Sequence, residues 1–511
     1  MIRLKSFLQD QFQDGEGEGS TLVNPTTAQP VATVSTKGLD LAAAFAHARN
    51  VGGPKLRGMT FAERGALLKA MSKALHGARD ELLDASRINA GTTRTDGKFD
   101  VDGATGTLAY YAGIGKSLGD RRFLVEGEGE QITRSARFWG HHVKVPLRGV
   151  AVHVNAFNFP AWGFAEKAAV AILAGVPVIT KPATSTALTT YRCFEVLAKE
   201  GLLEGGVMQL LCGSAGDLLS HLGPQDALAF TGSGDTGAYM RGLENVIAKS
   251  VRVNVEADSL NAVVLAEDVE PGSETWQMFV RDAAREITQK TGQKCTATRR
   301  IFVPRTRVDA VVEALSEELA QVRFGDPAED GVRVGPLASK QQFDDVRSGI
   351  GALVEAGAKV AWKGEAPEGK GFFVPATLLV HDDPKAADIV HDREVFGPVS
   401  TVLPYDSTSE AVELVARGQG GLVASVYGND RGALSELILG LAPWSGRVLV
   451  GSKKVADQAI SPGMVLPSCV HGGPGRAGGG EELGGLRGLD FYLQRTAVQG
   501  DRALLDRILG E

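Results

Sequence analysis

The chain has 511 residues, 43% of them hydrophobic and 23% charged, which is enough for two or three globular domains with large cores. A formal net charge of −7 disfavours a nucleic-acid-binding protein, which normally carries a basic face. No apolar run of about 20 residues and no apolar signal core occur, so we expect no membrane span and no secretory signal. Four cysteines without a CxxC pair predict a reducing, cytoplasmic setting.

Residues 39 to about 114 are expected to be mainly helical, after a Gly- and polar-rich start. Residues 20–34 predict a strand hairpin, and helical periodicity then covers residues 39–49 and 60–86. The second of these helices opens on Thr60, with Glu63 three residues later. That spacing is typical of a capping box, in which each residue satisfies a backbone N–H of the other.

Residues 122–147 show an alternation of apolar and polar residues and contain β-branched residues, which predicts a hairpin that stands apart from the helices. From Gly149 onward, short apolar strands alternate with helices, which predicts a parallel sheet covered on both faces. The strands are expected at 150–154, 176–179, 207–211, 227–230, 251–255 and 262–265, and helices at 164–173, 188–200 and 215–222. A second α/β series is expected over about 274–450, and a final strand at 491–498.

Cys295 is the first candidate for chemistry. It lies between a helix-like run, residues 276–290, and a strand-like run, residues 300–303, and Gly292 gives the backbone freedom for a sharp approach. A cysteine at such a junction can present its sulfur to a cleft as a nucleophile. The alternative is that Cys295 is a small buried hydrophobic residue, the usual state of a free cysteine.

A glycine-rich pattern, GxGxxG, is formed by Gly232, Gly234 and Gly237 between a predicted strand and a predicted helix. Glu256 ends the next strand about 20 residues on, as in the dinucleotide-binding fingerprint. The pattern predicts a pyrophosphate at the helix N-terminus, with Glu256 on the adenosine ribose. However, the fingerprint normally lies in the first βαβ unit and here it comes late, so the role of Glu256 stays open at this point.

Six motifs, some of which contain the residues named above, follow one another along the chain: Asn158-Phe159-Pro160, Lys181-Pro182-Ala183, Phe230-Thr231-Gly232-Ser233, Glu256, Gly292-Gln293-Lys294-Cys295 and Glu394-Val395-Phe396-Gly397-Pro398-Val399. With these motifs in this order, the chain resembles the aldehyde dehydrogenase superfamily over nearly its full length. The stretch from Trp139 to Pro160 looks like the branch found in phenylacetate and benzoate catabolism.

The resemblance implies an α/β fold of the aldehyde dehydrogenase type. A Rossmann-like cofactor domain would comprise residues 1–122 and 148–255, and an α/β catalytic domain would comprise residues 256–475. A small β oligomerisation element would combine residues 123–147 with residues 476–511. We expect a homodimer or a dimer of dimers, because such strands present an open edge that can pair with another subunit.

The resemblance also implies a reaction. Cys295 would attack an aldehyde as a thiolate and pass through a thiohemiacetal to a thioester, with Asn158 helping to bind the oxyanion. Glu256 would be the general base that lets water hydrolyse the thioester, which reverses its interpretation as a ribose ligand. Lys167 matches a lysine thought to relay protons; a solvated ion on a helix face is the alternative. Glu166 beside it could line a polar channel or face water.

The resemblance also implies which residues bind the cofactor. Lys181 would hold the adenosine ribose, Ser233 beside Gly232 would bind the pyrophosphate, and Glu394 would bind the nicotinamide ribose. Phe396 would pack near the nicotinamide or belong to the core, and Phe157 replaces a family tryptophan in the cofactor site.

NADP is the expected cofactor, with NAD possible. Relatives that prefer NAD often carry an acidic residue where this chain has Thr184. Thr184 and Ser185 could donate hydrogen bonds to a 2′-phosphate that a carboxylate would repel. No metal is expected, because His141, His142 and His153 lack ligand spacing.

The substrate implied by the resemblance is a CoA-thioester semialdehyde from aromatic degradation. Three alternatives stay open: a CoA-acylating enzyme, a broad-specificity aliphatic aldehyde dehydrogenase and a catalytically silent structural member. The segment after the base, Ala257 to Asn261, lacks the Leu-Gly-Gly that many relatives carry there, which leaves substrate and cofactor details open.

Overall fold

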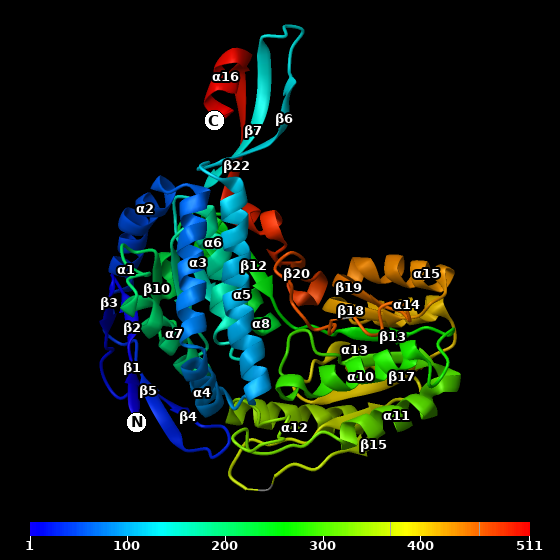
Figure 1. Cartoon of the computed structure of the whole chain (residues 1–511). Coiled ribbons are helices and arrows are strands. Elements are labelled where there is room, and N and C mark those ends of the chain that lie inside the picture. Colours follow the sequence, from blue (N-terminus) through cyan, green and yellow to red (C-terminus); the bar gives the residue numbers. More distant parts are fainter. Residues whose placement is uncertain (368, 459, 511) are drawn as a thin grey trace.

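Two seven-stranded sheets form the body of the protein, and a small three-stranded sheet projects from it (Figure 1). The computed structural model describes residues 1–367, 369–458 and 460–510. Among these residues, no helix is both long and apolar enough to cross a membrane. The α/β fold class predicted from the sequence is confirmed by the mixed sheets and their helices.

The first large sheet has the order β12-β11-β8-β9-β10-β2-β3, and its first five strands are parallel. Its strands are β2 (Ser6–Leu8), β3 (Gln11–Gln13), β8 (Ala151–Val154), β9 (Val178–Lys181), β10 (Met208–Leu210), β11 (Ala227–Thr231) and β12 (Arg252–Glu256). Its helices are α1 (Leu41–His47), α2 (Gly53–Gly58), α3 (Phe61–Gly77), α4 (Arg79–Ala90), α5 (Arg94–Leu118), α6 (Trp162–Ala174), α7 (Ala187–Lys199), α8 (Gly234–Arg241) and α9 (Glu244–Ala248).

Several local predictions in this half are confirmed. Thr60 and Glu63 form the capping box at the start of α3, with each side chain accepting from the other's backbone N–H. The hairpin at residues 20–34 is β4 (Ser20–Val23) paired antiparallel with β5 (Pro30–Val34), and β1 (Ile2–Leu4) joins it. The helix expected at 215–222 is wrong. One 3₁₀ turn forms at Leu218–His221, because left-handed backbone at Gly216 interrupts a longer helix.

The second large sheet has the order β15-β16-β17-β14-β13-β18-β19 and is parallel except for β15. Its strands are β13 (Ala262–Leu265), β14 (Arg300–Pro304), β15 (Lys359–Lys363), β16 (Thr377–Val380), β17 (Val399–Tyr405), β18 (Gly421–Tyr427) and β19 (Ser445–Gly451). Its helices are α10 (Glu274–Thr288), α11 (Val308–Ala320), α12 (Lys340–Glu355), α13 (Asp388–Asp392), α14 (Thr408–Ala416) and α15 (Arg431–Leu441). This is the second α/β series that the sequence predicts.

The projecting sheet joins segments that are far apart in the chain. β6 (Leu124–Gln131) and β7 (Phe138–Pro146) form the predicted hairpin, and β22 (Leu493–Asp501) pairs antiparallel with β7 (Figure 1). A C-terminal helix that the sequence analysis missed, α16 (Arg502–Leu509), follows β22. A second hairpin, β20 (Val470–Gly472) with β21 (Glu481–Leu483), lies between the two large sheets and the projection.

Candidate active site

The loop that carries Cys295 is bent by left-handed backbone. After α10 ends, Lys290, Thr291 and Gly292 all have positive φ, from 53° to 67°. A Cβ atom on Gly292 would lie 2.1 Å from the carbonyl oxygen of Gly397, so that no larger residue fits without moving the backbone. The sharp approach expected at Gly292 is therefore present, and it carries the chain from α10 to Cys295, which is largely buried.

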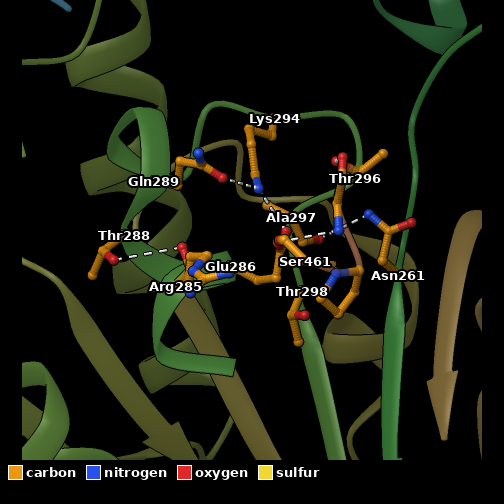
Figure 2. Close-up of polar contacts among 12 residues, drawn as sticks. Asn261, Arg285, Glu286, Thr288, Gln289, Lys294, Thr296, Ala297, Thr298 and Ser461 are labelled. Carbon is orange, nitrogen blue, oxygen red and sulfur yellow. Dashed lines mark hydrogen bonds and ion pairs between the residues drawn. The ribbon is translucent and has the colours of Figure 1, made fainter. Parts of the chain in front are cut away.

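Asn261 holds this loop from the adjacent sheet. Its side-chain N–H groups donate to the carbonyl oxygen of Ala297 (Figure 2) and to that of Cys295, both at 2.8 Å. Its side-chain oxygen accepts from the backbone N–H of Val423. The sequence analysis treated this segment as a departure from relatives, and no local pattern pointed to the clamp that Asn261 makes.

A buried ion pair lies immediately before the cysteine. The Lys294 ammonium is 2.7 Å from a carboxylate oxygen of Glu286 on α10, and it donates to the Gln289 side chain at 2.8 Å (Figure 2). The other Glu286 oxygen accepts from the Ser461 hydroxyl and from the Gly463 backbone N–H. The pair therefore ties the nucleophile loop to the segment around residue 463, which lines a pocket next to Cys295.

Glu256 and His471 face the sulfur of Cys295. Glu256 ends β12 and is buried, and one of its carboxylate oxygens lies 3.1 Å from Nε2 of His471 on β20. The same Nε2 is 3.9 Å from the Cys295 sulfur. Sequence reasoning selected Glu256 and Cys295 but missed His471, which lies 176 residues from Cys295 in a glycine-rich tail.

The charges in this cluster act on one another. Burial raises the pKa of the Cys295 thiol well above its usual value, and the nearby Glu256 carboxylate adds to that effect. Burial alone would raise the pKa of Glu256, but the His471 and Lys167 charges outweigh it and lower that pKa. Burial likewise opposes a charged His471, yet Glu256 outweighs burial and raises the pKa of His471.

Lys167 on α6 is buried, which excludes the alternative of a solvated ion on a helix face. Its ammonium lies 3.0 Å from the Glu166 carboxylate and 3.2 Å from the carboxylate of Glu482 on β21. Burial raises the pKa of Glu482 to about 7, against the opposing effect of Lys167. Glu166 lines the same pocket as Lys167, so of its two open roles the structure favours the channel wall.

Two pockets meet at Cys295. The first includes three aromatic residues, and Ala156, Asn158, Thr231, Glu256 and Cys295 line both. The other residues of the first are Phe99, Phe159, Trp162, Gly163, Glu166, Lys167, Thr296, Gly463, Val465 and His471. Asn158 donates to the carbonyl oxygen of Gln293 at 3.0 Å, and its amide carries a second N–H that this bond does not use.

The second pocket lies along the carboxyl ends of the first sheet's strands. It brings together nearly all of the residues expected to hold a cofactor: Phe157, Lys181, Thr184, Gly232, Ser233, Glu394 and Phe396. Ser185 is the exception among them and does not line this pocket; its carbonyl accepts from the Asn89 side chain.

At one end of this pocket, Ser233 caps α8 by accepting from the Thr236 backbone N–H, so the N-terminus of that helix faces the pocket. At the other end, Phe157 and Phe396 form an edge-to-face pair with centroids 5.8 Å apart. Glu394 lies beside them and accepts from the Ser259 backbone N–H at 3.0 Å. Burial raises the pKa of Glu394 to about 7 in spite of the nearby Arg299.

Known proteins support this architecture. The model of the aldehyde dehydrogenase family matches residues 12–498. A 3,4-dehydroadipyl-CoA semialdehyde dehydrogenase from Aromatoleum evansii is 44% identical over 480 residues, covering 93% of each chain. The NAD+ complex of an aldehyde dehydrogenase from Bacillus cereus is 26% identical with a TM-score of 0.85, covering 98% of this chain and 97% of that one. Lactaldehyde dehydrogenase from Escherichia coli shares the fold, with 24% identity, a TM-score of 0.85 and coverage of 98% and 99%. The chain belongs to the aldehyde dehydrogenase family.

Proposed function

We propose that this protein uses NADP to oxidise a CoA-thioester semialdehyde to the acid, through a thioester on Cys295 that water hydrolyses. The observation that carries the reaction type is the position of Cys295 at the junction of two pockets, with Asn158 and Glu256 lining both. The substrate class is suggested by the Aromatoleum evansii relative, whose name gives 3,4-dehydroadipyl-CoA semialdehyde as its substrate.

The chemistry follows from the positions of these groups. The Cys295 thiolate attacks the aldehyde carbon, and the negative charge that forms on oxygen is stabilised by the Asn158 amide and the Cys295 backbone N–H. A nicotinamide cofactor, which Lys181, Ser233 and Glu394 would hold, would supply the hydride acceptor, and the oxidised carbon would be left as a thioester on the sulfur. Glu256 then takes a proton from water, the resulting hydroxide attacks the thioester, and the acid leaves with regeneration of the thiolate. Lys167 would pass the proton onward.

The second pocket fits a nicotinamide dinucleotide. The N-terminus of α8 at Ser233 suits a pyrophosphate, while Lys181 and Glu394 can each bind ribose hydroxyls. The nicotinamide supplies the hydride acceptor. Thr184 lines this pocket without a carboxylate, which supports preference for the 2′-phosphate of NADP. Ser185 contributes less to that argument, because it lies outside the lining.

A dimer is also proposed. The exposed edges of β22 and β6 in the projecting sheet, together with the edge strand β19, offer strands for pairing with a second copy. Light scattering at micromolar concentration should give at least twice the 53.8 kDa chain mass, and a monomeric mass would refute the proposal. We also propose the three domains expected from the sequence, with boundaries after residues 122, 147, 255 and 475.

The test of function is steady-state NADPH formation from medium-chain aldehydes and from a CoA-thioester semialdehyde. Cys295→Ala and Glu256→Gln should each lower kcat by at least about 10³, since neither bond formation nor water activation has a substitute. Turnover that requires free CoA would instead establish the CoA-acylating alternative. Equal efficiency with simple aliphatic aldehydes would support the broad-specificity alternative, and full activity of Cys295→Ala would refute the proposal.

A further inference from the structure

His471 is a buried group beside Cys295 that the proposed reaction leaves without a role. Its Nε2 lies 3.9 Å from the Cys295 sulfur and 3.1 Å from the Glu256 carboxylate. The side chain is buried, and β20 holds its backbone against β21. Because the imidazole contacts both a reacting atom and the base that acts on it, its charge must affect the chemistry of each.

A thiolate at this position faces an electrostatic problem. It would form in a buried site close to the Glu256 carboxylate, and two unscreened anions at such a distance repel strongly. Both burial and Glu256 raise the pKa of Cys295, so the environment without a cation favours the unreactive thiol. A nucleophilic role for Cys295 therefore requires a positive charge within reach of the sulfur.

The charged groups that face His471 come from every element packed around it: Glu256 (β12), Cys295 (the loop after α10), Glu166 and Lys167 (α6), Arg447 (β19) and Glu482 (β21). Two of these are cations, Lys167 and Arg447, and each has at least one other polar partner. Lys167 lies between Glu166 and Glu482, and Arg447 donates to the carbonyl oxygen of Pro462. The imidazole is distinguished by proximity to both groups, since its Nε2 lies 3.9 Å from the sulfur and 3.1 Å from the Glu256 carboxylate.

We propose that His471, as the imidazolium, is the counter-ion that stabilises the Cys295 thiolate and makes it available for attack. The S–H bond of Cys295 breaks, its proton goes to solvent, and the charge that stays on sulfur lies against the Nε2–H of His471. The proposal deepens the proposed function and rests on it, because it concerns the nucleophile of that reaction. Glu256 supports the arrangement, since its carboxylate raises the pKa of His471 and so favours the imidazolium.

The same geometry predicts that His471 affects the attack on the aldehyde and the hydrolysis of the thioester differently. Nε2 carries one hydrogen, so it can donate fully to the sulfur or to the Glu256 oxygen, but not to both. Once Cys295 is a neutral thioester, the imidazolium is left with Glu256, and this contact makes the carboxylate a weaker base. Loss of His471 should therefore slow the attack on the aldehyde without slowing hydrolysis of the thioester.

The direct test is the alkylation rate of Cys295 by iodoacetamide between pH 5 and 9, with EDTA and without aldehyde or cofactor. A Cys469→Ser background removes the exposed thiol. Three proteins are compared: the parent, His471→Gln, which removes the charge, and His471→Lys, which retains it. One pKa unit is a tenfold change in thiolate. We expect His471→Gln to react about 10–100-fold more slowly at pH 7, to approach the parent rate at high pH, and His471→Lys to recover most of the rate.

Equal rates for the parent and His471→Gln at pH 7 would overturn the proposal. So would a His471→Lys variant no faster than His471→Gln, because the effect would then be structural rather than electrostatic. Rapid-quench kinetics give a second readout: the hydride burst should slow in His471→Gln while thioester hydrolysis does not. Alkylation needs no aldehyde, so a protein that failed to oxidise aldehydes would refute the proposed function and leave this result standing.

Discussion

Replacing Lys294 by Met leaves the Glu286 carboxylate without its cation in a site where both side chains are 0% exposed. Glu286 would keep the Ser461 hydroxyl and the Gly463 N–H, but no positive charge. Removing one partner of a buried ion pair typically costs about 3–5 kcal/mol in the free energy of unfolding. Since 1 kcal/mol shifts the melting temperature of a domain of 150–250 residues by about 2–4 °C, Tm should fall by roughly 6–20 °C.

The assay is thermal unfolding followed by circular dichroism at a fixed scan rate, because unfolding of a chain this large is often irreversible. The double variant Lys294→Met/Glu286→Gln should recover at least half of the loss, since no uncompensated charge remains. Lys340→Met is the matched control. It breaks an exposed pair with Asp344, and such pairs contribute only about 0–1 kcal/mol. A Lys294→Met protein as stable as this control, or a double variant worse than both single variants, would refute the reasoning.

Four further predictions test the pockets and the loop. Thr184→Glu should lower kcat/KM for NADP by about 10–100-fold and spare NAD, because a carboxylate repels the 2′-phosphate; parallel losses with both cofactors would argue against that cause. Asn261→Ala should lower kcat by about tenfold, since two loop carbonyls lose their donors; an unchanged kcat would show the clamp to be dispensable. Gly292→Ala should abolish Cys295 alkylation, because the new Cβ meets the Gly397 carbonyl, and normal alkylation would contradict it. The pKa of Glu394 is raised to about 7, so its carboxylate forms as pH rises; KM for the cofactor should fall between pH 6 and 8 in the parent and stay flat in Glu394→Gln.

Local patterns predicted much of the fold. The apolar run at residues 151–154 forms β8, which is buried on both faces as expected of a central parallel strand, and the Thr60–Glu63 spacing produced the expected cap. The prediction of a helix at 215–222 was wrong because apolar periodicity does not reveal the left-handed backbone at Gly216. The sequence analysis did not recognise α16, which is a short surface helix at the end of the chain.

In the candidate site too, the residues that lie in sequence motifs were predicted, and those that act through long-range contacts were not. Motif order selected Cys295, Asn158 and Glu256, and the structure brings all three to one junction. His471, Asn261 and the partners of Lys294 were missed, because each acts through a contact between segments far apart in the chain. Such contacts leave no periodic or spacing signal, and the glycine-rich stretch around His471 only marks a loop. These contacts are recognised only from the three-dimensional structure.

The measurement that tests the central claim most directly is the intact mass of Glu256→Gln after one turnover with aldehyde and NADP. The account predicts one NADPH per active subunit and a mass gain equal to the acyl group. Peptide mapping should place that group on Cys295, because attack and hydride loss proceed while hydrolysis lacks its base. Steady turnover without an accumulated acyl group would contradict the assignment of Glu256, and an acyl group on any other residue would contradict that of Cys295.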